Sequence, residues 1–320
     1  MAKQLEPYKC AFSLSNEILT KAVGLSFKLG ELSLSNIGKA TDEDAAMGIK
    51  YLLEAENVSI SPSQLKGLKS GGDVPSHPLA TSLCALARSL PHTDPYDKSF
   101  LVKFEEAVWK EGVPHRLSRR VPDYPYPIPM HARIDDLIGG LFSFAKAGKG
   151  KVHPLVLSSL LYFEILAIAP YSEYNRVLAG LLFKAVLGSY QPVFYRVCLE
   201  KLILQQKEKL DASIAASVEK GDTSPFVLFM LGLLETGVNS LFHRSLQSEK
   251  AESPLVQKML SKMESGKFYS SAELCALLGL KSRLGLQKNY LRPALASKAI
   301  EMSNPLSPTD RTQRYRRREN

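Results

Sequence analysis

Apolar side chains recur along most of this chain at the three- and four-residue spacing of amphipathic helices. Residues 13–34 show this spacing, and Ser15 is a candidate N-cap for the helix that it predicts. Thr41 precedes three acidic residues, which favours the start of a second helix that runs to Leu53. Residues 57–78 read as loops around a short helix, and further helices are predicted at 79–90, 99–111, 131–147, 154–168, 176–189, 192–219 and 224–249. The predicted fold class is therefore all-α.

Prolines mark one interruption of this helical pattern and two helix starts. Residues 113–130 hold five prolines and no helical spacing, so we expect a short extended flap there. Pro154 and Pro192 instead stand where helices would begin, a position that tolerates the missing N–H.

The end of the chain shows the spacing of a helix-turn-helix. Ser270 and Glu273 predict a helix start, and Gly279 predicts its C-cap. A second helix would span 281–302 and be kinked or split by Pro293. Leu284, Leu286 and Leu291 in this helix are candidates for the core.

Positive charge gathers in the same region. The chain has a formal net charge of +9, and residues 266–320 alone carry 11 Lys and Arg against 4 Asp and Glu. This asymmetry favours an anionic partner for the C-terminal end. The alternative is a solvated, disordered basic tail.

Other features of the sequence limit the class of protein and its location. The four cysteines are widely spaced, which favours free thiols over structural zinc. The longest apolar stretch, residues 152–169, is interrupted by polar residues and does not read as a membrane span. No secretory signal is recognised at the N-terminus. We therefore expect a cytoplasmic protein that does not bind a membrane.

The segment HPLVLSSLLYFEILAIAPYSEYNRVLAGLLFKAVLG, residues 153–188, resembles the core of the Fic (Fido) family. That family carries the loop H-P-F-x-[D/E]-G-N-G-R-x-x-R between two helices. Residues 123–146 resemble the family's proline-rich stretch and following helix, residues 219–237 its closing helix, and residues 270–316 the winged helix often appended to it. The resemblance implies three regions: a helical N-terminal region (1–112), a Fic-like core (113–249) and a winged-helix module with a basic tail (266–320).

The loop departs from the family pattern at several positions. Read without gaps, the loop matches the family at Pro170, Glu173 and Asn175, which align with the proline, the acidic residue and the asparagine. Ala169 aligns with the family histidine and Tyr171 with the phenylalanine. Tyr174 and Arg176 align with the two glycines, and Val177 and Gly180 with the two arginines. A one-residue deletion after Asn175 would instead align Arg176 and Ala179 with the arginines. Ala169 replaces the histidine in either alignment.

These departures affect the activity that the resemblance implies, which is protein adenylylation with ATP and Mg²⁺. In the family the acidic residue holds Mg²⁺, the arginine neutralises phosphate, and the histidine takes the proton of the target hydroxyl. Glu173 would hold the metal here, and Asn175 and Arg176 would contact the nucleotide. Alanine cannot accept a proton, and loss of a positioned general base typically costs on the order of 10²–10⁴ in rate. A simpler interpretation is that Glu173 and Asn175 only cap the next helix.

Three histidines could in principle substitute. His115 and His131 flank the proline-rich stretch, and His115 is the better candidate, whereas His153 begins a helix at the far end from the loop. The family's inhibitory signature, [S/T]-x-x-x-E-[G/N], has no match in the chain.

Three functions follow as hypotheses. The first is a catalytically impaired Fic protein that binds or regulates a protein partner. The second is a transcriptional regulator that binds DNA through the C-terminal module. The third is an active transferase with altered chemistry. For the second, the predicted DNA-contacting residues are Lys281, Arg283, Lys288, Arg292, Arg311, Arg314 and Arg316.

Overall fold

The computed structural model describes residues 8–33, 39–109, 129–251, 254–280, 282–296, 299–304, 310 and 312–318. The chain divides into two compact units, Met1–Asn239 and Ser240–Asn320. The predicted flap falls mostly on residues 110–128, outside the described residues. The predicted region boundaries at 112, 249 and 266 stay predictions.

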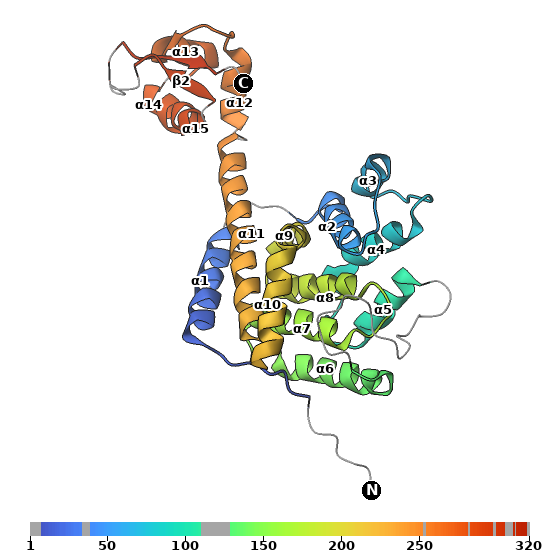
Figure 1. Ribbon diagram of the computed structural model, residues 1–320. Coiled ribbons are helices and arrows are strands. Elements are labelled where there is room, and N and C mark those ends of the chain that lie inside the picture. The colour runs from blue at the N-terminus through green and yellow to red at the C-terminus, as the bar shows by residue number, and fades with distance from the viewer. Residues whose placement is uncertain are drawn as a thin grey trace. The chain divides into compact units, whose positions relative to one another are not determined.

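The first unit is built almost entirely from helices (Figure 1). In chain order they are α1 (Asn16–Ser33), α2 (Asp42–Ala55), α3 (Pro62–Lys69), α4 (Pro78–Ser89), η1 (Leu90–His92), α5 (Ser99–Val108), η2 (His131–Arg133), α6 (Ile134–Gly148), α7 (Pro154–Ile168), α8 (Asn175–Tyr190), η3 (Pro192–Tyr195), α9 (Leu199–Gln205), α10 (Lys207–Lys220) and the first part of α11 (Ser224–Ala251). The η elements in this unit are short 3₁₀ turns, and the residues of α11 from Ser240 onward belong to the second unit. The all-α prediction is confirmed.

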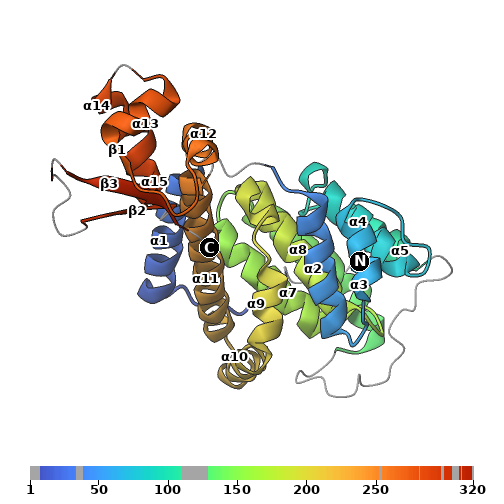
Figure 2. The ribbon, with the colours of Figure 1, turned by 90° about the horizontal axis from the view of Figure 1, so that it is seen from above.

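Helices α7 and α8 form the centre of this unit, as both views show (Figures 1 and 2). Each is apolar around most of its circumference, the pattern of a helix that is buried on every side. They pack against each other, with α6 beside α7 and α2 beside α8. Tyr162 of α7 contacts Phe183 of α8 and Phe226 of α11, at ring-centroid distances of 5.7 and 5.9 Å. The loop between α7 and α8 is therefore held by the core of the unit.

The helix starts follow the signals in the sequence. The Ser15 hydroxyl accepts a hydrogen bond from the Ile18 N–H at 3.2 Å. Thr41 and Asp44 form a reciprocal capping box at the start of α2. Pro154 and Pro192 both lie in the first turn of their elements. These predictions are confirmed.

One predicted helix is wrong in its extent. The sequence pattern predicted a single helix over 192–219, but this range holds η3, α9 and α10. The chain bends at Cys198 and again at Gln206, which lies between α9 and α10 with φ −113° and ψ 28°. Before the bend, α9 packs against α2, and Ile203 and Leu210 on the two sides of Gln206 are both buried.

The N-terminal segment is bound to the core of the first unit. The Tyr8 hydroxyl donates a hydrogen bond to the Glu164 carboxylate of α7, and burial raises the pKa of that carboxyl. The Tyr8 side chain lies so close to Gly140 that a Cβ on this glycine would approach it to 2.9 Å. Residues close to the start of the chain thus cover α6 and α7.

The second unit combines short helices with a small sheet. After the end of α11 it contains α12 (Pro254–Lys262), β1 (Tyr269–Ser270), α13 (Ser271–Leu278), α14 (Arg283–Leu286), the π-helical turn η4 (Gln287–Leu291), α15 (Arg292–Ala296), β2 (Ile300–Met302) and β3 (Arg314–Arg317). The sheet is antiparallel with strand order β1-β3-β2, and it pairs Tyr269 with Tyr315 and Glu301 with Arg316.

The predicted helix-turn-helix agrees with this unit in part. Ser270 and Glu273 form a capping box on α13, and Gly279 ends it with a φ of 68°, as predicted. The second helix is divided near Pro293, because proline cannot donate the hydrogen bond that would continue an α-helix, and the π-helical turn directly precedes this division. The predicted extent to residue 302 is wrong, since Ile300–Met302 is a strand paired with β3.

One helix among the described residues is long and apolar enough to span a membrane by length and composition, namely the Ser224–Phe242 part of α11. Half of that stretch is buried inside the protein. A core helix of a soluble protein has the same composition, so this helix is weak evidence for a membrane span.

Candidate functional site

The loop that carries the family resemblance joins α7 to α8. Ala169, which replaces the family histidine, is the C-cap residue of α7 and is 0% exposed. Its N–H donates to the Ile165 carbonyl at 2.9 Å. The position where proton abstraction would begin therefore holds a methyl group that solvent does not reach.

Two residues of the loop adopt the left-handed backbone conformation. Ala169 has a φ of 45° and Tyr174 a φ of 61°. Non-glycine residues in this region cost on the order of 1–3 kcal/mol, which the surrounding structure must offset. Tyr174 aligns with a family glycine, so the backbone keeps the conformation that glycine favours while the side chain adds an aromatic ring.

Asn175 holds the loop in this conformation. Its side-chain oxygen accepts a hydrogen bond from the Tyr171 N–H at 3.1 Å, and its amide nitrogen donates to the Tyr171 carbonyl at 2.8 Å. Asn175 is only 5% exposed, so both bonds lie in the protein interior. Its role is to close the loop on itself. The interpretation of Asn175 as a helix cap is wrong, because α8 has no side-chain cap from its own flanking residues.

A carboxylate from another helix reaches the N-terminus of α8. Glu56, which ends α2, accepts a hydrogen bond from the Arg176 N–H at 3.0 Å and a further one from the Val177 N–H. Free N–H groups and the helix dipole make such a terminus an anion site, and the resemblance implies nucleotide phosphates there. The anion at this site is a side chain of the protein.

The electrostatics of Glu56 reflect this position. Burial raises the pKa of the Glu56 carboxyl, while the N–H groups of α8 and the Arg176 side chain act in the opposite direction. Glu173 adds a small further increase in the pKa, since it places a second negative charge nearby. A phosphate group at this terminus would meet two carboxylates.

The positions of the family arginines are filled by core packing. Val177 and Ala179 are both 0% exposed. A Cβ on Gly180 would lie 2.4 Å from the Leu52 side chain of α2. In either alignment, the last arginine of the family loop has no room here. Arg176, which the second alignment places on the first arginine, is partly buried at the start of α8.

An aromatic cluster covers the loop on one side. Tyr171 stacks with Phe104 at 5.8 Å and contacts Trp109 at 4.8 Å, and the Tyr174 ring lies 6.2 Å from Trp109. The Tyr171 hydroxyl donates to Glu105 of α5 at 2.7 Å, and burial together with this carboxylate raises the pKa of Tyr171. The family phenylalanine position is thus anchored to α5.

Glu173, the predicted metal ligand, is exposed at the loop surface. No group of three or more His, Cys, Asp or Glu that could hold a metal ion occurs among the described residues. Glu173 makes no hydrogen bond there and does not cap α8. A Mg²⁺ ion at this carboxylate would take its remaining ligands from water and from a bound phosphate.

Of the candidate histidines, only His153 has a described side chain, and it does not reach the loop. His153 caps the opposite end of α7, where its Nδ1 accepts from the Leu155 N–H at 3.3 Å and its Nε2 lies 3.0 Å from the Ser26 hydroxyl. Burial lowers the pKa of His153. His115 lies outside the described residues, and His131 is described only as the backbone of η2.

Most of the predicted DNA-contacting residues lie at the surface of the second unit. Exposed side chains are those of Arg283, Lys288, Arg292 and Arg314. Arg316 is partly buried and donates from Nε to Glu301 at 2.8 Å. Lys281 and Arg311 lie outside the described residues.

The three leucines of the second helix differ in burial. Leu286 and Leu291 are 0% and 2% exposed, in agreement with a core role. Leu284 is 75% exposed, so its assignment to the core is wrong. The short α14 turns Leu284 outward beside Arg283, away from the core cluster of the unit.

Comparison with known proteins agrees with this architecture. Over 98% of this chain and 99% of the other, the fold is similar to the crystal structure of a Fic family protein from Desulfovibrio desulfuricans G20, with a TM-score of 0.64 and 23% sequence identity. The chain has the Fic fold. Residues 254–317 match the family model of the Filamentation induced by cAMP protein Fic-like, C-terminal domain. Together these similarities support the Fic family membership predicted from the sequence. No curated protein matches the chain.

Sequence analysis missed Glu56, although a signal for it exists. The sequence Leu52–Asn57 ends in Glu-Asn at the spacing of the Fic inhibitory signature, but Leu52 stands where that signature has Ser or Thr. A search for the exact inhibitory signature therefore does not find this segment. The helix terminus that Glu56 binds lies 120 residues later in the chain, a contact that only the fold establishes.

The hydrogen bonds of Asn175 can be tested by substitution. Asn175→Ala leaves the buried Tyr171 N–H and carbonyl without partners, at a cost of about 1–3 kcal/mol for each group. We expect a loss of about 2–6 kcal/mol in the free energy of unfolding, measured by urea denaturation. The fluorescence of Trp109, the single tryptophan of the chain, would report directly on this region.

Glu173→Ala is the matched control, because the residue is exposed and lies in the same loop. It should change the free energy of unfolding by no more than about 0.5 kcal/mol. Equal losses for the two variants would show that Asn175 does not hold the loop.

Proposed function

We propose that this chain is a Fic-fold protein that has lost the adenylyl-transfer chemistry of the family and acts by binding a protein partner. The observation that carries this proposal is the buried Ala169 methyl group at the position of the general base. A second, independent feature supports it, since the Glu56 carboxylate lies at the helix terminus where the family binds phosphate.

The two features affect different parts of the reaction. Loss of the base removes proton abstraction from the attacking hydroxyl, worth on the order of 10²–10⁴ in rate. Occupation of the α8 terminus opposes binding of the phosphates on which a nucleotidyl transfer depends. A single substitution would not restore both.

A transfer assay tests this proposal. The purified chain would be incubated with Mg²⁺, a lysate, and ATP, UTP or CTP labelled on the α-phosphate. We expect no label on the chain itself or on lysate proteins. Label from any of the three nucleotides would instead favour an active transferase with altered chemistry.

The Ala169→His variant tests, in the same assay, whether the missing histidine alone accounts for the absence of transfer. We expect it to remain inactive, because the positions of the family arginines at Val177, Ala179 and Gly180 are closed by packing. If this one substitution produced labelling, the remainder of the site would have to be competent, which would contradict the proposal.

A second candidate function is DNA binding by the C-terminal unit. The antiparallel sheet, α13 and the divided second helix have the element order of a winged helix-turn-helix, in which the second helix enters the major groove. Exposed cations on that helix and on β3, among them Arg283, Lys288 and Arg314, support contact with phosphate. Such a unit would add regulation to a protein-binding Fic domain.

Fluorescence anisotropy with labelled duplex DNA would test this candidate. If four phosphates are contacted, affinity should fall by about 10²-fold between 50 and 200 mM salt. Lys288→Glu should weaken binding, whereas Lys258→Glu, the same charge change on α12, should have a smaller effect. Absence of binding at 50 mM salt, or equal effects of the two variants, would contradict it.

A further inference from the structure

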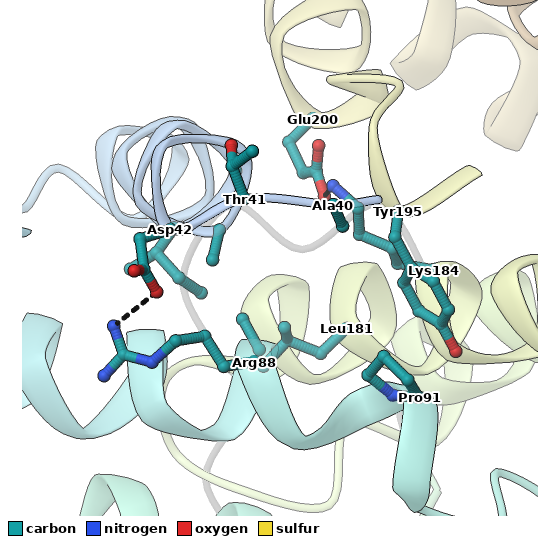
Figure 3. A pocket seen from close by; sticks show the side chains of 13 residues that line it. Ala40, Thr41, Asp42, Arg88, Pro91, Leu181, Lys184, Tyr195 and Glu200 are labelled. Carbon is teal, nitrogen blue, oxygen red and sulfur yellow. Dashed lines mark hydrogen bonds and ion pairs between the residues drawn. The ribbon is translucent and has the colours of Figure 1, made fainter. Parts of the chain in front are cut away.

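Outside the Fic loop, the first unit has a cavity among α2, α4, α8, η3 and α9 (Figure 3). Its charged side chains form ion pairs with one another. Arg88 lies 3.5 Å from Asp42, a pair drawn as a dashed line in Figure 3, and Lys184 Nζ lies 2.8 Å from Glu200 Oε1. Charges that are paired within the protein indicate no particular ligand. The exposed face of α1, which does not line this cavity, gives a clearer indication of a partner.

Helix α1 is apolar on two opposite faces. The inner face is buried, with exposed fractions of 0–3% at Ile18, Ala22, Leu25, Leu29 and Leu32. The outer face carries Leu19, Val23 and Phe27, which are 50%, 58% and 71% exposed. Because these three residues are spaced four apart, their side chains form one stripe along the helix, the α1 stripe.

The α1 stripe is a concentration of exposed apolar surface. Nine large apolar side chains are exposed among the described residues, and four of them are the three of the stripe and Leu14, just before α1. Single exposed apolar residues are normal on soluble proteins, whereas a contiguous group marks an interaction surface. We therefore expect a partner to cover the stripe.

Two polar contacts help to hold α1 in this orientation. The Ser26 hydroxyl lies 3.0 Å from Nε2 of His153, at the start of α7, and Lys28 Nζ lies 2.8 Å from Glu235 Oε1 of α11. Together with the buried inner face, these contacts keep the α1 stripe at the surface.

The charged residues of α1 distinguish between classes of partner. The helix has two acidic residues, Glu17 and Glu31, and two basic residues, Lys21 and Lys28. A helix that binds an anionic membrane surface is instead rich in Lys and Arg on its polar face. The balanced charges of α1 therefore favour a protein surface of mixed charge over a membrane.

The α1 stripe is symmetric about Val23. Leu19 lies four residues before Val23, and Phe27 lies four residues after it. Two copies of α1 that pack antiparallel about a twofold axis at Val23 would place Phe27 of one copy level with Leu19 of the other. Beside the axis, a Cβ on Gly24 would have no atom within 4 Å, so this position leaves room for the approach of a second helix.

The same arrangement brings opposite charges together. Glu17 lies six residues before Val23 and Lys28 five residues after it, so Glu17 of one copy would lie beside Lys28 of the other. The Lys28 side chain is still 39% exposed in its pair with Glu235, which leaves it accessible to a second carboxylate. Parallel packing would instead place each charge beside its own kind. Complementary charges fix the orientation of an interface, and here they favour the antiparallel one.

We propose that α1 is a dimerisation helix, which packs antiparallel against α1 of a second copy of this chain. Its 18 residues extend about 27 Å, so a contact between two such helices is smaller than a standard interface of about 800 Å² per partner. We therefore expect a weak dimer, with a Kd of about 10 µM. This association does not depend on the Fic loop or on nucleotide chemistry.

Sedimentation equilibrium of the full-length chain tests the dimer. The average mass should rise from that of one chain toward that of two between about 1 and 200 µM protein. Phe27→Glu places a charge in the stripe of each copy and should raise the Kd at least about tenfold. Val102→Glu is the matched control, because Val102 is a 50% exposed apolar residue of α5, and it should leave the Kd unchanged. Thermal unfolding of both variants would establish that they are folded.

Cysteine substitution tests the antiparallel register. Val23→Cys lies on the proposed axis, so treatment with oxidised glutathione should link it to the same residue of the second copy. Glu17→Cys would lie about 18 Å from its counterpart, beyond the Cα separation of about 4.4–6.8 Å that a disulfide requires. On a non-reducing gel, Val23→Cys should give more covalent dimer than the unaltered chain with its four cysteines, and Glu17→Cys should not. A covalent dimer of Glu17→Cys without one of Val23→Cys would contradict the register.

Three further results would overturn the proposal. One is the mass of a single chain at every concentration up to about 200 µM. Another is an equal Kd for Phe27→Glu and the unaltered chain, which would place the contact elsewhere. The third is co-sedimentation of the chain with vesicles of phosphatidylcholine and phosphatidylserine that Phe27→Glu abolishes, since this would assign the stripe to a membrane surface.

Discussion

The bond between the Glu56 carboxylate and the first N–H groups of α8 connects the parts of this protein that bear on its function. It joins the end of α2 to the helix that follows the Fic loop, across 120 residues of chain. A helix terminus favours an anion, and here the protein supplies one from its own sequence. Burial of this carboxylate raises its pKa, which shows that the interaction is made at some cost in solvation. In this protein the start of α8 is thus occupied by an internal contact of the fold.

The loop between α7 and α8 combines a strained backbone with side chains that differ from the Fic family pattern. Ala169 and Tyr174 have positive φ values although neither is glycine, and the two hydrogen bonds of Asn175 hold the turn closed between them. The aromatic rings of Tyr171 and Trp109 cover this turn. The surrounding packing of α7 and α8 must offset the cost of this strained conformation. A binding surface built on this scaffold would be rigid, which lowers the entropic cost of recognition.

The sequence predicted the helical fold well and the site only in part. Caps at Ser15, Thr41 and Ser270 and prolines at helix starts are local signals, so the helices that they mark were placed correctly. The bend at Gln206 and the strand at Ile300 depend on distant packing and were missed. The replacement of the histidine by Ala169 is visible in the sequence, whereas the burial of its methyl group is not. Glu56 and Glu105 reach the start of α8 and the loop through contacts between helices far apart in the chain, which no local pattern predicts.

Direct measurement of nucleotide binding tests most simply whether Glu56 closes the anion site at the start of α8. Isothermal titration of the full-length chain with ATP and Mg²⁺ should give no saturable heat up to about 1 mM nucleotide, since Glu56 and Glu173 oppose a triphosphate at α8. Glu56→Ala, which frees the helix terminus, should bind ATP at least about tenfold more tightly than the unaltered chain. Saturable binding of ATP by the unaltered chain with a micromolar Kd would contradict this interpretation of the site.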